Sequence, residues 1–321
     1  MALNPLSLSY SRANPQRIVV LGGSGFVGRS LIARLARAGH TLIIPTRHPA
    51  QHRDLLVNPG LSVRHADIHD TNTLSDLVKD ADTVVNLVGI LFESKRQTFQ
   101  ANHTDLVLNL LHAMRTHGTK RLIAMSSLGA RSDGPSEYLR SKGRAEAAIR
   151  ASELNWSIIR PSVIFGPGDN FLNQFAHLLR WAPILPLART HARFSPCYVE
   201  DVSEALARCI QHPQTHHRAF DLGGPEIFTL KELVLMVAHL KGWHRSVLTL
   251  PDAVGLLQAW ALECLPTPPM TRDNFASLSE DSVTSDQGFT DLGILPARLT
   301  DVVPRYLHND STAARHTITT N

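Results

Sequence analysis

A glycine cluster near the start of the chain constrains the fold more than any other segment. An apolar run over residues 18–21 leads directly into the pattern Gly-x-x-Gly-x-x-Gly, and apolar residues then recur at helical spacing over residues 30–40. A strand, a tight glycine turn and a helix in this order place a dinucleotide pyrophosphate on free backbone N–H groups at the helix N-terminus. The pattern therefore predicts a dinucleotide-binding loop, made by Gly22, Gly25, Phe26, Val27 and Gly28.

The residues after this loop alternate between apolar runs and amphipathic helical stretches. The expected strands are residues 18–21, 41–45, 62–65, 83–87, 121–125 and 157–160. The expected helices are residues 25–38, 73–77, 97–116 and 137–154. Because buried parallel strands read as continuous apolar runs, this alternation predicts a doubly wound parallel α/β sheet, the Rossmann fold.

The pattern changes after about residue 166, where proline and glycine cluster and the apolar segments become shorter. We therefore expect a small C-terminal lobe beside the Rossmann core. The expected parts are a flexible N-terminal tail 1–16, a Rossmann NAD(P)-binding core 17–166, a smaller substrate or partner lobe 167–308 that returns in part to the core, and a disordered tail 309–321.

The composition argues against several classes of function. The net charge is +4, aromatic residues make up only 6% of the chain and the basic residues are scattered, which argues against nucleic-acid binding. The three cysteines lie far apart and match no metal-ligand spacing, so no metal site is expected. No apolar run is long enough to span a bilayer. The expected location is the cytoplasm, with peripheral contact at the inner face of a membrane left open.

The strand after the glycine helix bears on the choice of cofactor. NAD-selective sites usually have an acidic residue at the end of this strand, whereas here the strand ends in Thr46 and Arg47. Arg47 offers a fork of donors that suits a 2′-phosphate, and Arg29 is placed to assist; the alternative is a solvated loop arginine. NADP(H) is therefore the preferred cofactor, with NAD(H) as the alternative. Asp67, after the third strand, either accepts from the adenine amino group or serves as an N-cap or turn residue.

A Tyr-x-x-x-Lys pattern, Tyr138 and Lys142, indicates proton-transfer chemistry. Residues four apart on a helix share a face, so the phenol and the ammonium can point into one cleft. The cation stabilises a phenolate, and the lysine is also placed to bind the nicotinamide ribose. Ser126 and Ser127 follow the expected strand 121–125, and one of them is expected to bind a substrate carbonyl; the spacing does not decide which. The alternative is an ordinary surface pair of tyrosine and lysine.

These motifs, in this order, resemble those of the short-chain dehydrogenase/reductase superfamily, in its extended or atypical branch. The matching segments are residues 22–28, 86–89, 102, 126–127, 138–142, 160–169, 198–202 and 220–225. Residues 269–274, 278–281 and 288–294 further resemble the group of the 39-kDa accessory subunit of mitochondrial NADH:ubiquinone oxidoreductase. The resemblance implies a dinucleotide site that also includes Leu87, Val88, Gly89, Asn102, Lys142 and Pro161.

Three functions are compatible with these residues. The first is an NADP(H)-dependent oxidoreductase acting on a small apolar carbonyl or quinone-like substrate. The second, implied by the resemblance, is a non-catalytic NADPH-binding accessory or assembly subunit of a respiratory NADH:quinone oxidoreductase or a quinone-biosynthesis complex, with membrane-associated partners. The third is a nucleotide-sugar epimerase or dehydratase, which the short loop between Ser127 and Tyr138 disfavours. The sequence leaves the substrate, the oligomeric state and the partner proteins undetermined.

Overall fold

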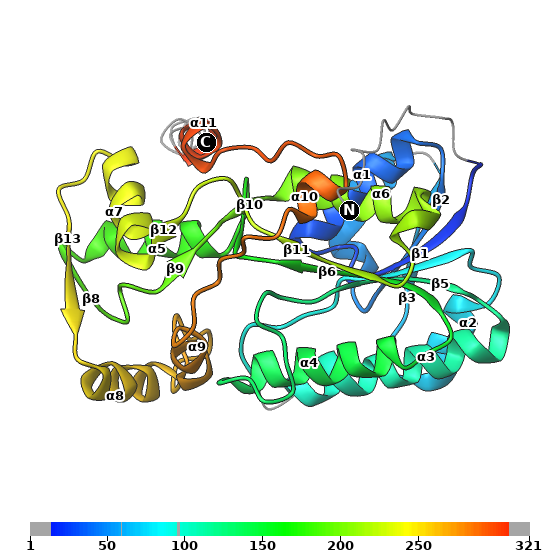
Figure 1. Ribbon diagram of the computed structural model, residues 1–321, viewed down its shortest axis with the longest axis horizontal. Coiled ribbons are helices and arrows are strands. Elements are labelled where there is room, and N and C mark those ends of the chain that lie inside the picture. Colours follow the sequence, from blue (N-terminus) through cyan, green and yellow to red (C-terminus); the bar gives the residue numbers. More distant parts are fainter. Residues whose placement is uncertain (1–13, 59, 95–96, 308–321) are drawn as a thin grey trace, which may run out of the picture. The chain divides into compact units, whose positions relative to one another are not determined.

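A parallel sheet of seven strands forms the centre of the computed structural model, which describes residues 14–58, 60–94 and 97–307 (Figure 1). Across the sheet the strands are β11 (Arg218–Leu222), β6 (Asn155–Pro161), β5 (Arg121–Met125), β4 (Thr83–Asn86), β1 (Arg17–Leu21), β2 (Thr41–Thr46) and β3 (Leu61–His65). All neighbouring pairs are parallel, and the order of the strands reverses between β1 and β4. The predicted doubly wound α/β fold is confirmed.

The central position of β1 follows from its sequence. Residues 18–21 are four consecutive apolar side chains, each 0% exposed, so both faces of this strand must be covered. In doubly wound sheets a ligand binds at the carboxyl ends of the strands where the strand order reverses. Here that point lies between β1 and β4.

Helices cover both faces of the sheet. Figure 1 shows α1 (Phe26–Arg37) and α6 (Val199–Gln211) on one face, and α2 (Thr71–Val78), α3 (Leu106–His117) and α4 (Glu137–Arg150) on the other. An ion pair between Arg34 and Glu204 and a 2.8 Å hydrogen bond between the Ser30 and Ser203 hydroxyls join α1 to α6. The first unit also contains η1 (Pro49–Val57), the π-helical turn η2 (Gln100–Asp105), η3 (Pro213–Thr215) and α10 (Gly288–Asp291).

The predicted strands all form, and the predicted helices form with shifted bounds, of which the third and fourth depart for identifiable reasons. Residues 97 and 98 do not open the third predicted helix, because Gln97 pairs with Ser94 in an isolated bridge; the helical conformation begins at Phe99, whose N–H the Glu93 carboxylate accepts. The fourth predicted helix ends at Arg150 rather than at 154, since the Ser152 hydroxyl donates to the Ile149 carbonyl and closes the last turn. The edge strand β11 was not among the predicted strands.

The chain divides into two compact units. The first runs to Pro161 and adds residues 200–222 and 286–295; the second comprises residues 162–199, 223–285 and the chain from 296 onward. The elements of the second unit are β7 (Ile164–Phe165), α5 (Phe171–Trp181), β8 (Ile184–Ala188), β9 (Arg193–Phe194), β10 (Cys197–Tyr198), β12 (Phe228–Thr229), α7 (Leu230–Leu240), β13 (Ser246–Leu250), α8 (Asp252–Leu262), α9 (Arg272–Ser277) and α11 (Leu299–Leu307).

The second unit has its own apolar core, in which Phe165, Leu179 and Leu233 are fully buried. Its strands form the two-stranded pairs β10–β7, β12–β9 and β13–β8. Among the described residues, no helix combines the length and the apolar character that crossing a bilayer requires. The tails predicted at 1–16 and 309–321 lie outside the described residues, except for residues 14–16.

Candidate functional site

The predicted site residues all belong to the first unit, and most of them follow the carboxyl end of a parallel strand. The glycine loop follows β1, Arg47 follows β2, Asp67 follows β3, residues 87–89 follow β4, residues 126–127 follow β5, and Pro161 ends β6. The other three are Asn102 on η2 and Tyr138 and Lys142 on α4, two elements that pack together. Because parallel strands end at one edge of the sheet, these residues share that edge.

Two positions in the glycine loop require the absence of a side chain. Gly22 has φ +75°, and a Cβ there would lie 3.0 Å from the carbonyl carbon of Leu87 at the end of β4. At Gly28 a Cβ would lie 2.6 Å from the Cα of Gly23, so α1 packs directly on the loop that precedes it. The close approach of α1 to the loop depends on Gly28, and the close approach of the loop to the end of β4 depends on Gly22.

The N-terminus of α1 is open. Gly25 is its N-cap residue, and within the described part of the chain no side chain caps this end or places an acid in the first turn. The first N–H groups of a helix need an acceptor, and the helix dipole favours an anion there. The Phe26, Val27 and Gly28 N–H groups therefore form a cradle that fits a pyrophosphate.

The two arginines considered for the 2′-phosphate, Arg47 and Arg29, differ in their contacts. Arg47 is exposed directly after the strand. Arg29, on the first turns of α1, donates from Nε to the Ser24 carbonyl at 3.1 Å and pairs with Asp54, whose pKa is lowered by this contact. Arg29 is thus held in place by an acid of the protein, whereas Arg47 projects into solvent.

Asp67 occupies a turn. Its carboxylate accepts the His69 N–H at 3.0 Å, and the N-cap of α2 is Asp70, which accepts the Thr73 N–H at 2.7 Å. Of the two roles that the sequence left open, Asp67 therefore fills that of a turn residue in this structure. Its side chain is exposed, so the second carboxylate oxygen still faces solvent.

The segment after β4 lies beside the lysine of α4. The Asn86 side chain accepts the Val88 N–H at 3.1 Å and turns the chain at the end of the strand. The Val88 carbonyl then accepts from Lys142 Nζ at 3.3 Å, and a Cβ added at Gly89 would lie 3.5 Å from the same nitrogen. The contact joins this loop to Lys142.

Lys142 is buried, with 6% of its surface exposed. Its ammonium donates to the carbonyls of Val88 and Met125, the latter at 3.1 Å, which leaves one N–H without an acceptor among the described residues. Burial lowers the pKa of Lys142 to about 8, an effect partly opposed by the carboxylate of Glu146. The side chain is therefore mostly charged at neutral pH.

Tyr138 lies one turn before Lys142 on α4 and is half-buried. Its ring makes edge contacts with Phe99, at a centroid distance of 5.8 Å, and with His103, at 5.5 Å. A Cβ at Gly89 would lie 3.8 Å from His103 Nε2 and 3.5 Å from Lys142 Nζ, so Gly89 lies between the lysine and the histidine that the tyrosine ring contacts.

The two serines after β5 differ in accessibility. Ser126 is 8% exposed, and its hydroxyl is buried with no hydrogen-bond partner among the described residues; it lines a cavity of about 10 Å³ together with Lys142 and Glu146. This volume is close to the minimum that holds one water molecule. Ser127 is partly exposed, and its carbonyl accepts the Ala130 N–H at 3.2 Å.

Asn102 and Pro161 make contacts within the protein. The Asn102 amide donates at 3.0 Å to the carbonyl of Thr98, two residues before η2 begins, and Asn102 does not line the cavity beside Lys142. The Pro161 carbonyl accepts the Leu128 N–H at 3.1 Å and so closes the loop after β5.

The residue next to Asn102, His103, borders the cavity that Lys142 also lines, and it was not among the site residues predicted from the sequence. It is 1% exposed and lines the same small cavity. A signal for it was present in the sequence, because His103 falls among apolar residues at helical spacing. In the structure it is buried together with Phe99, Leu106, Val107 and Leu110. A histidine within an apolar helical stripe needs polar partners, which makes it a candidate for a structured role.

No cluster of three or more potential metal ligands occurs within the described ranges. Residues 22–170 match the model of an NAD(P)H-binding protein family. The chain is 30% identical over 299 residues to the mitochondrial NADH dehydrogenase (ubiquinone) 1 alpha subcomplex subunit 9 of Arabidopsis thaliana, covering 87% of this chain and 74% of that protein.

Two further proteins extend the comparison. A ceramide reductase of Caulobacter vibrioides is 29% identical over 248 residues, which is 76% of each chain. The crystal structure of an NADPH-dependent quinone oxidoreductase of Escherichia coli in complex with NADPH superposes with a TM-score of 0.72 over 93% of this chain and 99% of that one. At 18% identity, this second likeness shows a shared fold.

Proposed function

Because the chain belongs to the short-chain dehydrogenase/reductase superfamily, in the group of the 39-kDa subunit of NADH:ubiquinone oxidoreductase, we propose that it is an NADP(H)-dependent oxidoreductase. Its substrate is a small apolar carbonyl or quinone-like compound. The observation that carries this proposal is the pairing of Tyr138 and Lys142 on one face of α4, beside the loop after β4 and on the sheet edge that bears the open glycine loop.

The nucleotide is held by groups that this unit leaves available. The N–H groups of residues 26–28 bind the pyrophosphate, and Arg47 binds the 2′-phosphate. The remaining N–H of Lys142 binds the nicotinamide ribose, with the backbone of Leu87, Val88 and Gly89 alongside. Asp67 and Pro161 border the adenine and nicotinamide ends. When bound, NADPH supplies a hydride to the carbonyl carbon.

The side chains of α4 and β5 supply the proton. The Tyr138 phenol donates a proton to the carbonyl oxygen, and the Lys142 ammonium stabilises the phenolate that remains. Hydride plus proton converts the carbonyl to an alcohol, and the phenolate regains its proton from water. Of the two serines, the partly exposed Ser127 is the one a substrate can reach, while the buried Ser126 hydroxyl lies behind it.

The proposal is tested by following NADPH absorbance while purified protein is offered a panel of apolar aldehydes, ketones and quinones. We expect NADPH oxidation that depends on both the protein and one class in the panel. Tight NADPH binding without oxidation by any member would contradict the oxidoreductase assignment.

Replacing Arg47 with alanine tests the cofactor preference. We expect the NADPH dissociation constant to rise about 10- to 100-fold, because hydrogen bonds to charged groups contribute about 1.5–3 kcal/mol. The NADH dissociation constant should stay unchanged, since NADH lacks the 2′-phosphate. Isothermal titration calorimetry with both nucleotides measures the difference.

Arg37→Ala, which removes an exposed arginine from the far end of α1, is the matched control and should bind both nucleotides like the parent. Equal NADPH affinity in Arg47→Ala and the parent would refute the role of Arg47. Equal weakening toward NADH would place Arg47 elsewhere on the nucleotide.

A second candidate function is favoured by the surface of α8 in the second unit. This helix exposes large apolar side chains on most of its circumference, including Leu257 at 63% and Trp260 at 55%, while its buried residues are the small Gly255 and Ala259. A helix that is apolar on most sides is usually buried in a protein core or covered by a partner protein or a membrane. If this chain is an NADPH-loaded accessory subunit, the membrane-associated assembly that it contacts would cover α8.

Flotation with phosphatidylcholine–phosphatidylglycerol vesicles tests whether α8 of such a subunit contacts the lipid surface. We expect the parent to float and Leu257→Asp to lose about tenfold in vesicle affinity, because burying one leucine contributes about 1.5–3 kcal/mol. Leu108→Asp, at an exposed leucine of α3 in the first unit, is the control and should float like the parent. A parent that does not float would rule out contact with lipid through α8.

A further inference from the structure

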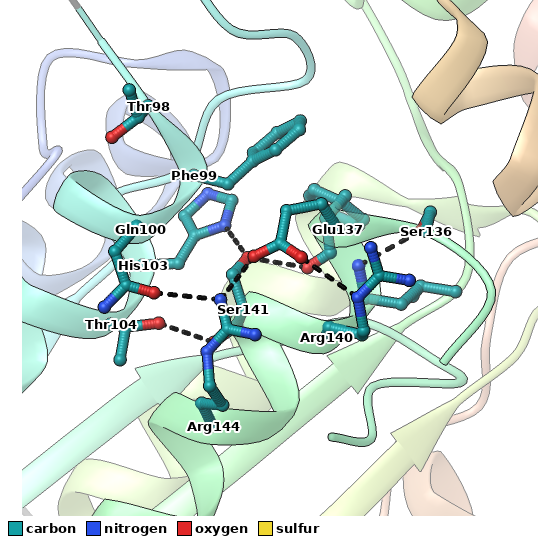
Figure 2. A network of polar contacts seen from close by, with 12 residues as sticks. Thr98, Phe99, Gln100, His103, Thr104, Ser136, Glu137, Arg140, Ser141 and Arg144 are labelled. Atoms are coloured by element: carbon teal, nitrogen blue, oxygen red, sulfur yellow. Dashed lines mark hydrogen bonds and ion pairs between the residues drawn. The ribbon is translucent and has the colours of Figure 1, made fainter. Parts of the chain in front are cut away.

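The buried His103 joins two elements of the candidate site. Its Nε2 accepts the Ile90 N–H at 3.1 Å, and Ile90 belongs to the loop that follows β4. Its Nδ1 lies 2.8 Å from the hydroxyl of Ser141 on α4. Figure 2 shows the imidazole on η2 directed at Ser141, with the Phe99 ring beside it. One side chain thus connects η2, the β4 loop and α4.

The hydrogen-bond partners define the protonation of the ring. Nε2 receives a proton from a backbone N–H, so it carries none of its own. The Ser141 hydroxyl donates to the Tyr138 carbonyl at 2.8 Å, so it accepts from His103, and Nδ1 bears the hydrogen. Burial, together with the charge of Lys142, holds the pKa of His103 at about 2. The imidazole is therefore neutral and does not titrate in the working range of the protein.

The His103 ring contacts Tyr138 directly and is connected to Lys142 through the loop after β4. Tyr138 packs against it edge-on, with an interplanar angle of 82°. The Lys142 ammonium is hydrogen-bonded to the Val88 carbonyl, two residues before the N–H that His103 holds. Displacing the loop would move the Val88 carbonyl, and with it the ammonium.

We propose that His103 is a positioning residue. Its two hydrogen bonds, to the β4 loop and to α4, set the distance between that loop and the face of α4 that carries Tyr138 and Lys142. This inference deepens the proposed function and rests on it, because it concerns the lysine assigned to the nicotinamide ribose. His103 exchanges no proton with the substrate, since both ring nitrogens are bonded inside the protein. Its contribution is the orientation of Lys142.

The test compares His103→Leu, which removes both hydrogen bonds, with His103→Gln, whose amide has a donor and an acceptor to replace them. His112→Leu, at an exposed histidine of α3, is the matched control. The readout is the NADPH dissociation constant from fluorescence titration between pH 6 and pH 9.5, which requires no turnover. Where a substrate has been found, kcat and KM are measured alongside.

In the parent, NADPH affinity should fall as the pH rises through about 8, because Lys142 loses its proton there. In His103→Leu we expect affinity at neutral pH to fall about tenfold, since one ribose hydrogen bond is lost. The pH at which affinity declines should also rise, because a loosened Lys142 regains water. His103→Gln should restore both the NADPH affinity at neutral pH and the pH at which that affinity declines. In His103→Leu, kcat should fall by a larger factor than KM rises, and His103→Gln should not show this difference.

A merely structural role would lower the melting temperature without moving the pH of the decline, and that result would overturn the proposal. So would an imidazole of the parent that shows the Nε2–H or the charged form by ¹⁵N NMR between pH 5 and pH 9. A parent that binds NADPH but reduces no carbonyl would refute the oxidoreductase assignment and leave these binding predictions standing.

Discussion

Tyr138→Phe is expected to lower kcat by about 10²- to 10⁴-fold, the usual contribution of a positioned acid or base. The variant removes the phenolic oxygen and keeps the ring, so the edge contacts with Phe99 and His103 remain. NADPH affinity should therefore stay at the parent value, because no part of the proposed nucleotide cradle changes. Steady-state rates with the substrate found in the carbonyl and quinone panel, together with an NADPH titration, measure both quantities.

Tyr306→Phe is the matched control for this variant. It removes the same atom from the second unit, where the Tyr306 hydroxyl donates to Asp169 at 3.0 Å, and it should leave kcat unchanged. If Tyr138→Phe turns over like the parent, Tyr138 is not the acid, and the proposed chemistry on α4 fails.

Gly28→Ala is expected to abolish measurable NADPH binding and to lower the melting temperature. The new Cβ would lie 2.6 Å from backbone atoms of Gly23, so α1 must move away from the loop. Overpacking of this kind costs about 1–3 kcal/mol of stability. The movement also misplaces the N–H groups of residues 26–28. Thermal unfolding and a nucleotide titration give the two effects.

Gly89→Ala provides the comparison for stability. A Cβ at this position meets only ordinary contacts, the nearest at 3.5 Å, so the melting temperature should match that of the parent. A Gly28→Ala protein with parental NADPH affinity would show that the nucleotide does not depend on the close packing of α1 on the loop.

Local patterns in the sequence predict most of the secondary structure of the first unit. The strands β1, β2 and β5 contain continuous apolar runs, and such runs predict buried parallel strands without knowledge of their partners. The glycine loop was predictable because its spacing requires a strand before it and a helix after it. The four-residue spacing predicted that Tyr138 and Lys142 lie one turn apart on a helix, and both lie on α4.

What the sequence did not reveal depends on contacts between distant segments. The edge strand β11 mixes Arg218 and Asp221 with apolar residues, and it becomes a strand only by pairing with β6, some sixty positions earlier. The ion pair that holds Arg29 depends on Asp54, which a helical turn brings back to α1. Neither contact leaves a periodic trace in the sequence.

The central claim is that the first unit binds NADP(H) through its glycine loop, and native mass spectrometry tests it most directly. The full chain is mixed with equal concentrations of NADPH and NADH. We predict one NADPH adduct per chain, lost in Gly28→Ala and reduced in Arg47→Ala. A dominant NADH adduct, or NAD retained from purification, would contradict the claim and favour a nucleotide-sugar epimerase, and the absence of any nucleotide adduct would refute the site.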